Sequence, residues 1–194
     1  MKLNPKKLLR HQKIKKEISF HYNNVVEAFL KKEKKLKNKN FLTFPDDNQL
    51  TLSYTDFKKE YLNVSMFLKK YGLKKKDKIS IIFFNQPEFF LFYFSCLSSG
   101  LIVVPINPDL SSQEIEYIIK HSGTKLVIFT KKISYKLNPI KKNISSLSIN
   151  SFKDLKRYKK INLINKNKKK VSLYDEAVII YTSGTTGNPK GVVL

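Results

Sequence analysis

The residues best suited to chemistry lie near the end of the chain, where residues 181–191 read YTSGTTGNPKG. Hydroxyl side chains, glycines and one lysine share this stretch: Thr182, Ser183, Gly184, Thr185, Thr186, Gly187, Lys190 and Gly191. Glycines let backbone N–H groups converge on an anion, hydroxyls add rotatable donors, and lysine adds a compact positive charge. These residue types predict a loop that binds a polyphosphate. A solvated turn uses the same types, so composition alone leaves both interpretations open.

Two common phosphate-binding patterns are excluded. Neither Gly184 nor Gly187 has a Gly-Lys-Ser/Thr at the spacing of a Walker A loop, and the dinucleotide pattern G-x-G-x-x-G also fails. The residues after Lys190 read GVVL, which is typical of a strand. The loop therefore does not open a helix, and any binding of phosphate must come from the loop itself.

The segments that must position this loop alternate between short apolar runs and helical patterns. Ser53 and Asp56 have the spacing of a capping box, Pro87 suits a first helical turn, and Ser111 or Ser112 can cap a third helix. The expected strands are 78–84, 101–107, 125–130 and 176–183, and the expected helices run from 53 to 72, from 87 to about 98 and from 113 to 121. This alternation predicts an α/β fold of βαβ units, with a mostly parallel sheet flanked by helices.

The chain divides into four parts by composition. Residues 1–40 form a basic segment with one short helix, and residues 41–130 hold the βαβ-type subdomain. Residues 131–172 are rich in lysine and asparagine and are expected to be a peripheral connection with one short strand near SSLSIN. Residues 173–194 hold a strand, the phosphate-binding loop and the start of a further strand. No metal site is expected, because the histidines lack Cys, Asp or Glu at ligand spacing.

The net charge of +23 raises the question of a nucleic-acid partner. Arg10 and Arg157 are the only arginines, whereas recognition of bases and phosphates favours the guanidinium group. We therefore expect no nucleic-acid partner, and peripheral contact with an anionic membrane remains open. The apolar run 89–108 is interrupted by Gly100 and Pro105 and is expected to be core, not a membrane span. A single cysteine and no secretory signal favour the cytoplasm.

Residues 181–191 resemble the signature loop of the adenylate-forming superfamily, which includes acyl-CoA synthetases, peptide-synthetase adenylation domains and luciferases. The match to [ST]-S-G-[ST]-[ST]-G-x-P-K-G is complete. Residues 52–57, LSYTDF, resemble the family's L-T-Y-x-E-L helix start, and CLSSGLIVVPINP resembles its A-G-x-x-x-x-P-x-N-P strand. The resemblance runs from about residue 40 to residue 194, with residues 131–172 matching only in position.

The resemblance implies a ligase that uses ATP and magnesium to join a carboxylic acid to AMP and then passes the acyl group to a thiol, commonly that of coenzyme A. It implies that Lys190 is catalytic and contacts phosphate charge. Thr182, Ser183, Thr185 and Thr186 would supply hydroxyl contacts, and Gly184 and Gly187 the backbone donors. Within the family, Asn107 and Thr185 favour a coenzyme A ligase over a peptide-synthetase-type domain.

In this family the acyl pocket, the adenine and ribose contacts and a small C-terminal domain all follow the signature loop. The 194 residues are therefore expected to be an N-terminal portion that is inactive alone and lacks the coenzyme A site. The alternative class is a non-catalytic remnant or a basic binding module that keeps the first lobe of the fold.

Overall fold

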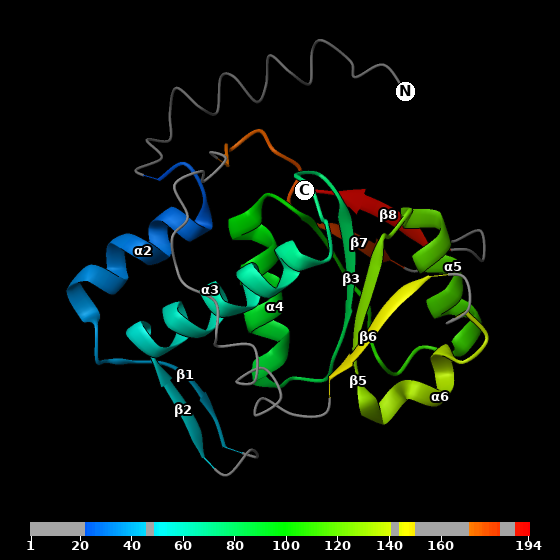
Figure 1. The fold of residues 1–194 in the computed structure, drawn as a ribbon, viewed down its shortest axis with the longest axis horizontal. Helices are drawn as coiled ribbons and strands as arrows, with labels where there is room; N and C mark the ends of the chain where they lie inside the picture. The colour runs from blue at the N-terminus through cyan, green and yellow to red at the C-terminus, as the bar shows by residue number, and fades with distance from the viewer. Residues whose placement is uncertain (1–21, 46–48, 141–143, 150–170, 183–188) are drawn as a thin grey trace.

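The centre of the molecule is a four-stranded parallel sheet with the order β4-β3-β5-β6. The computed structural model describes residues 22–45, 49–140, 144–149, 171–182 and 189–194. The central strands are β3 (Lys78–Ile82), β4 (Ile102–Pro105), β5 (Leu126–Thr130) and β6 (Ser145–Ile149). Helices lie on both faces of this sheet (Figure 1). The predicted α/β fold with a parallel sheet is confirmed.

Each face of the sheet has its own helices. On one face, α4 (Pro87–Ser99) connects β3 to β4, and α3 (Tyr54–Lys70) and α2 (Val25–Leu36) pack outside it. On the other face lie α5 (Ser112–Ser122), which connects β4 to β5, and the short α6 (Ser134–Leu137) (Figure 1). Consecutive connections therefore leave β3 and β4 toward opposite faces.

Strands β3, β4 and β5 are mostly apolar because both of their faces are buried, whereas the edge strand β6 (SSLSI) is mostly exposed. Ile79 and Ile81 of β3 pack into the core on the α4 side, whereas Ile82 packs into the core on the α5 side. Val103 and Val104 of β4 divide between the two cores in the same way. This follows from the two-residue period of a strand, and it explains why continuous apolar runs predicted β3, β4 and β5.

The predicted helix boundaries are confirmed by their caps. Ser53 caps α3 in a capping box with Asp56, and Ser111 caps α5 in a second capping box with Glu114. Gly100 and Gly123 end α4 and α5 with φ angles of +69°, a left-handed conformation that glycine adopts without a steric penalty. These local signals determine where each helix begins and ends.

Residues 131–149 contribute to the fold more than a peripheral connection would. After β5 come a 3₁₀ turn η1 (Lys131–Ile133) and α6, and their Ile133 and Leu137 are buried in the α5-side core. The strand expected near SSLSIN is β6, which pairs in parallel with β5. Residues 150–170, the rest of this connection, lie outside the described residues.

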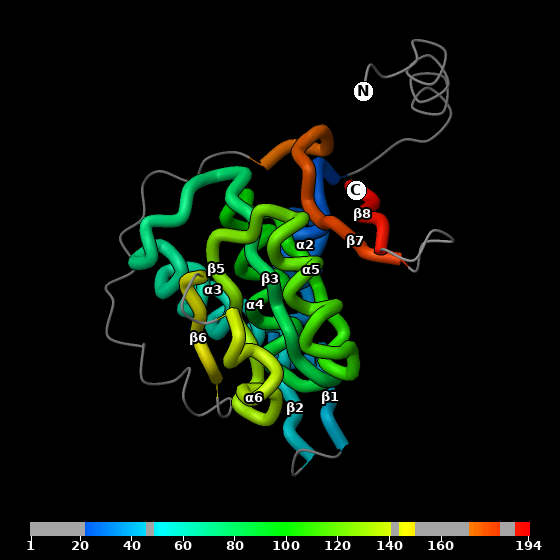
Figure 2. Tube along the Cα trace, turned by 90° about the vertical axis from the view of Figure 1, so that its right-hand side faces the viewer, coloured from blue at the N-terminus to red at the C-terminus, as the bar shows by residue number. Residues whose placement is uncertain are grey.

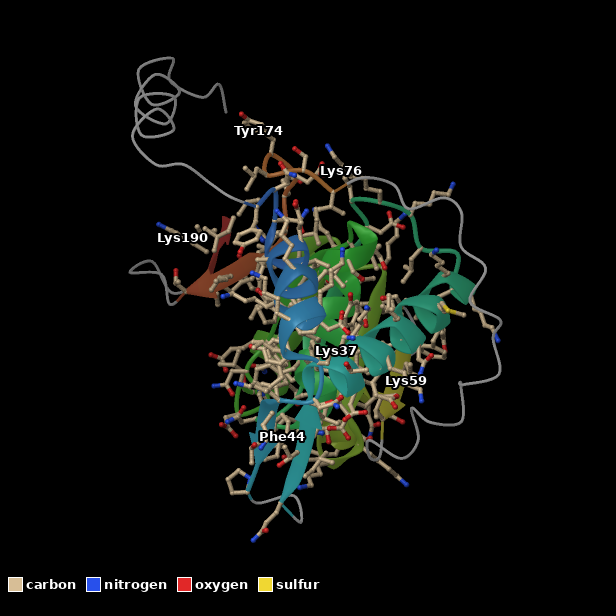
Figure 3. All side chains as sticks on the ribbon, turned by 90° about the vertical axis from the view of Figure 1, so that its left-hand side faces the viewer. Lys37, Phe44, Lys59, Lys76, Tyr174 and Lys190 are labelled. Atoms are coloured by element: carbon tan, nitrogen blue, oxygen red, sulfur yellow. The ribbon has the colours of Figure 1, made fainter. Side chains whose placement is uncertain are left out.

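An antiparallel hairpin near the N-terminus was not predicted. It consists of β1 (Asn40–Phe44) and β2 (Leu50–Ser53), and it leads into α3. Figure 3 shows Phe44 on this hairpin, and its ring lies 5.7 Å from the ring of Phe90 on α4. The short helix expected in residues 1–40 is α2, while residues 1–21 are outside the described part of the chain. No helix in that described part is both long and apolar enough to cross a membrane.

Candidate phosphate-binding site

The predicted phosphate loop is carried by a second antiparallel hairpin. Its strands are β7 (Ile179–Thr182) and β8 (Lys190–Val193), paired so that Thr182 lies opposite Lys190. These two residues mark the two ends of the connecting segment. The other predicted site residues, Ser183, Gly184, Thr185, Thr186 and Gly187, lie outside the described residues.

Thr182 and Lys190 form the mouth of this segment. Residues directly opposite in an antiparallel pair project from the same face, with Cβ atoms about 4.5–5.5 Å apart. Both side chains are exposed, and Lys190 points outward from β8 (Figure 3). Within the described ranges, the Lys190 ammonium makes no ion pair. The pair therefore presents a hydroxyl and a positive charge to solvent, a donor set that fits a phosphate oxygen.

The base of the hairpin is attached to the edge of the central sheet. The amide of Val103 in β4 donates to the Ala177 carbonyl at 2.9 Å, and a single parallel bridge joins Val103 to Val178. Just before the hairpin, Lys75 forms a 2.7 Å ion pair with Asp175. The hydrogen bond from Lys75 holds the pKa of the Asp175 carboxyl below its usual value. The loop is thus carried by a strand that continues the sheet beyond β4.

The far end of β7 contacts helix α5. The Tyr181 hydroxyl lies 2.7 Å from Nδ1 of His121, and the two rings meet edge to face with centroids 5.7 Å apart. Figure 2 shows the hairpin beside α5. The sequence explained His121 only by its place in the last turn of a helix. No local pattern joins two residues sixty positions apart, so this contact could not be predicted.

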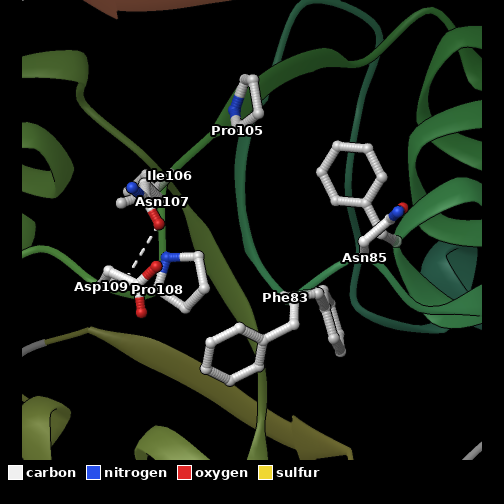
Figure 4. A pocket seen from close by; sticks show the side chains of 9 residues that line it. Phe83, Asn85, Pro105, Ile106, Asn107, Pro108 and Asp109 are labelled. Carbon is white, nitrogen blue, oxygen red and sulfur yellow. Dashed lines mark hydrogen bonds between the residues drawn. The ribbon is translucent and has the colours of Figure 1, made fainter. Parts of the chain in front are cut away.

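A separate cleft opens at the carboxyl ends of β3 and β4 (Figure 4). Its volume is about 350 Å³. It is lined by Phe83, Phe84, Asn85, Phe89, Pro105, Ile106, Asn107, Pro108 and Asp109. Because the connections after β3 and β4 leave toward opposite faces, the cleft lies at a topological switch point, where open α/β sheets bind ligands. Apolar rings with two amides and one carboxylate suit a flat, mostly apolar group.

The wall of this cleft is held in place by a lysine of α6. The Lys136 ammonium donates to the carbonyls of Pro108 and Leu110 at 2.8 and 2.9 Å. The Asn107 side chain accepts from the Asp109 amide at 2.9 Å, which closes an Asx turn (Figure 4). The sequence pointed to residues 101–107 as a strand and to Asn107 as a sign of the type of ligase, but neither the cleft nor the role of Lys136 was predicted.

Neither a reactive thiol nor a protein metal cage is found in the described residues. Burial raises the pKa of the Cys96 thiol, so Cys96 stays protonated and acts as a core residue. No group of three or more His, Cys, Asp or Glu side chains converges within those residues. Magnesium that accompanies a nucleotide is held largely by phosphate oxygens and water, so a site without such a cage still fits a magnesium-bound triphosphate.

Comparison with known proteins shows the family to which the chain belongs. The family model described as "AMP-binding enzyme" matches residues 29–194. The chain therefore belongs to the AMP-binding enzyme family, the adenylate-forming superfamily that its signature loop resembles. Two curated relatives are 28% identical to it: Bacitracin synthase 2 of Bacillus licheniformis over 148 residues, and the Long-chain-fatty-acid--CoA ligase of Bacillus subtilis (strain 168) over 191 residues.

The matches cover most of this chain but only part of each relative. They cover 76% of the chain and 5% of Bacitracin synthase 2, and 78% of the chain and 34% of the Bacillus subtilis ligase. Among solved structures, the inhibitor-bound N-terminal domain of FACL13 from Mycobacterium tuberculosis has a TM-score of 0.75 at 22% identity. That match covers 89% of this chain and 44% of the other, and it shows that the two share a fold.

Proposed function

We propose that these residues form the triphosphate-binding lobe of an ATP-dependent acid–thiol ligase, which makes an acyl-adenylate and passes the acyl group to coenzyme A. The observation that carries the proposal is the β7–β8 hairpin, which places Thr182 and Lys190 opposite each other at the ends of the signature loop. Membership of the AMP-binding enzyme family supports the adenylate-forming step. The choice of coenzyme A as acceptor, and a cytoplasmic location, are part of this proposal.

In the first step, a carboxylate oxygen of the acid attacks the α-phosphorus of ATP. A new oxygen–phosphorus bond forms, the bond to the oxygen bridging the α- and β-phosphates breaks, and pyrophosphate leaves. Negative charge grows on the leaving β- and γ-phosphates, where the Lys190 ammonium and the Thr182 hydroxyl can stabilise it. We assign the same task to the hydroxyls of Ser183, Thr185 and Thr186. Magnesium bound to the phosphates would neutralise further charge.

In the second step, the sulfur of the thiol attacks the acyl carbonyl carbon. A carbon–sulfur bond forms, the bond between the acyl carbon and the AMP oxygen breaks, and the thiol proton is released to water. The backbone N–H groups of Gly184 and Gly187 are assigned to the phosphates of the first step, so they have no role in this transfer.

A peptide-synthetase-type domain is the second candidate, because Bacitracin synthase 2 is among the relatives. The two candidates share the first step and differ in the acceptor, which is free coenzyme A or a pantetheine arm on a carrier protein. Incubating the protein and the acyl-adenylate with each acceptor in turn distinguishes the two candidate functions. Acyl transfer to free coenzyme A supports the first proposal, whereas transfer only to the carrier protein supports the second.

The role of Lys190 in adenylation is tested by measuring acid-dependent exchange of labelled pyrophosphate into ATP. The assay uses the whole gene product. Lys190→Ala removes a charge-assisted contact worth about 1.5–3 kcal/mol, which corresponds to a fall in exchange of roughly 10- to 150-fold. Lys132→Ala is the matched control, because Lys132 is an exposed lysine that lies in η1 and not in the hairpin. Equal exchange by wild type and Lys190→Ala would contradict the assigned role.

A further inference from the structure

We infer that His121 and Tyr181 are positioning residues that hold the mouth of the phosphate-binding loop against helix α5. The inference deepens the proposed function and rests on it, since it concerns the same loop. Tyr181 directly precedes Thr182, and its cross-strand partner Gly191 directly follows Lys190. A constraint on the Tyr181 ring therefore acts on both strands one residue away from the proposed phosphate contacts.

The first part of the constraint is the contact with α5. His121 lies in the last turn of that helix and stacks on Tyr117, with ring centroids 5.3 Å apart and planes 20° apart. Its Nδ1 lies 2.7 Å from the Tyr181 hydroxyl. Burial and the neighbouring Tyr117 raise the pKa of Tyr181, so the phenol remains neutral near pH 7. A neutral phenol and an imidazole can share this hydrogen bond in either direction.

The second part is the fit of the ring against β8. A Cβ atom placed on Gly191 would lie 3.1 Å from Cζ of Tyr181, closer than ordinary van der Waals contact. The ring therefore lies directly over the backbone of Gly191, in space that any other residue would partly fill. An aromatic ring over a cross-strand glycine is a known way to stabilise strand pairing at such a site. Together, His121 at the hydroxyl group and Gly191 beneath the ring restrict the position of the Tyr181 side chain.

A role limited to stability predicts different behaviour from a positioning role. The hydrogen bond joins partly exposed groups, so its loss should change the global stability little. A displaced loop would instead weaken contacts with the β- and γ-phosphates, both when ATP binds and when charge grows on the leaving pyrophosphate. Such a loss raises KM for ATP and also lowers kcat.

The experiment measures KM and kcat for ATP in the exchange reaction, and Tm, for wild type, Tyr181→Phe, His121→Leu and His121→Asn. Tyr181→Phe and His121→Leu should each raise KM about three- to tenfold, as expected for one lost hydrogen bond. His121→Asn should stay within about twofold of wild type, because an Asn side chain carries a polar atom where Nδ1 was. The double variant Tyr181→Phe/His121→Leu should raise KM no more than either single variant does, because each substitution removes the same hydrogen bond.

Tyr135→Phe is the matched control, since Tyr135 is 66% exposed and lies on α6. The inference is overturned if KM is unchanged in Tyr181→Phe and His121→Leu, if His121→Asn behaves like His121→Leu, or if the two losses add. A wild-type protein that neither binds ATP nor catalyses exchange refutes the proposed function instead. In that case hydrogen exchange still decides the inference: peptides covering 179–182 and 190–193 should exchange faster in both variants, and unchanged exchange overturns it.

Discussion

Gly191 offers a direct test of how tightly the hairpin is packed. In Gly191→Ala, the new methyl group would lie 3.1 Å from Cγ2 of Ile179 and 3.1 Å from Cζ of Tyr181. Carbon atoms prefer separations of about 3.5–4.0 Å, so one or both neighbours must retreat by roughly 0.4–0.9 Å. Ile179 is 7% exposed and belongs to the α5-side core, which leaves it little freedom. The half-buried Tyr181 ring is therefore the group expected to move.

The magnitude follows from two opposing terms. Overpacking costs about 1–3 kcal/mol, and the low end applies because the Tyr181 ring can shift outward. Replacing glycine by alanine where φ is not positive restricts the unfolded chain, which stabilises the folded state by about 0.4–1 kcal/mol. The net loss is then no more than about 0.5 kcal/mol, a fall in Tm of at most about 2 °C for a chain of this size. The shifted ring also stretches the 2.7 Å contact with His121, so KM for ATP should rise as in Tyr181→Phe.

Thermal unfolding followed by circular dichroism, with and without Tyr181→Ala, tests this reasoning. Once the ring is removed, Gly191→Ala should cost at least about 0.5 kcal/mol less than in wild type, as expected for residues in contact. Gly72→Ala is the control: Gly72 has φ +68° and nothing within 4 Å of the added Cβ, so its cost should not depend on Tyr181. An equal cost of Gly191→Ala in both backgrounds would refute the argument.

Two further predictions concern the helices that support the sheet. Urea unfolding should show that Lys58→Met destabilises the protein by about 2–3 kcal/mol and Glu33→Gln by only about 1 kcal/mol. In Lys58→Met, the Glu33 side chain, which is 8% exposed, is left charged without its 2.7 Å partner. In Glu33→Gln, the Lys58 side chain is 36% exposed and can reach water. Equal losses would show that Glu33 is not held as a buried charge. The pKa of Glu114 is held below its usual 4.5 by hydrogen bonds from the Ser111 side chain and backbone, so the stability that this carboxylate adds is present above pH 4.5 and is lost as the pH falls through the lowered pKa. Tm measured from pH 7 to pH 3 should therefore fall less steeply in Glu114→Gln than in wild type, and parallel curves would contradict this.

The parts of the fold that were predictable have local causes. Capping residues such as Ser111, left-handed glycines such as Gly123 and the apolar run of β3 act within a few residues, so they can be read from sequence. The β1–β2 hairpin was missed because its strands, NFLTF and LTLS, are only five and four residues long and no tight-turn pair joins them. Lys136 was missed because its hydrogen bonds reach residues more than 25 positions away, and the cleft was missed because its lining comes from the ends of two different strands.

In the candidate site, too, the sequence predicted the local features and missed those that depend on distant contacts. The residue order of 181–191 predicted the loop and the strand on each side, and β7 and β8 are both present. The orientation of the loop had no local signal, since it depends on where β7 meets the rest of the molecule. That meeting consists of the sheet edge at Val103 and the helix end at His121.

These two attachments have different consequences for the loop. The bridge between Val103 and Val178, just before β7, is the only pairing of this segment with β4 among the described residues, and it lies four positions before Thr182. Beyond the buried Ile179, β7 has no further pairing with the central sheet among the described residues, so small rotations there become larger displacements at the loop. The Tyr181–His121 contact lies next to the loop and opposes this rotation. A phosphate site carried on such a hairpin therefore needs the contact with α5 to keep the Lys190 charge in one place, because catalysis by charge stabilisation depends on groups that are already positioned when the charge develops.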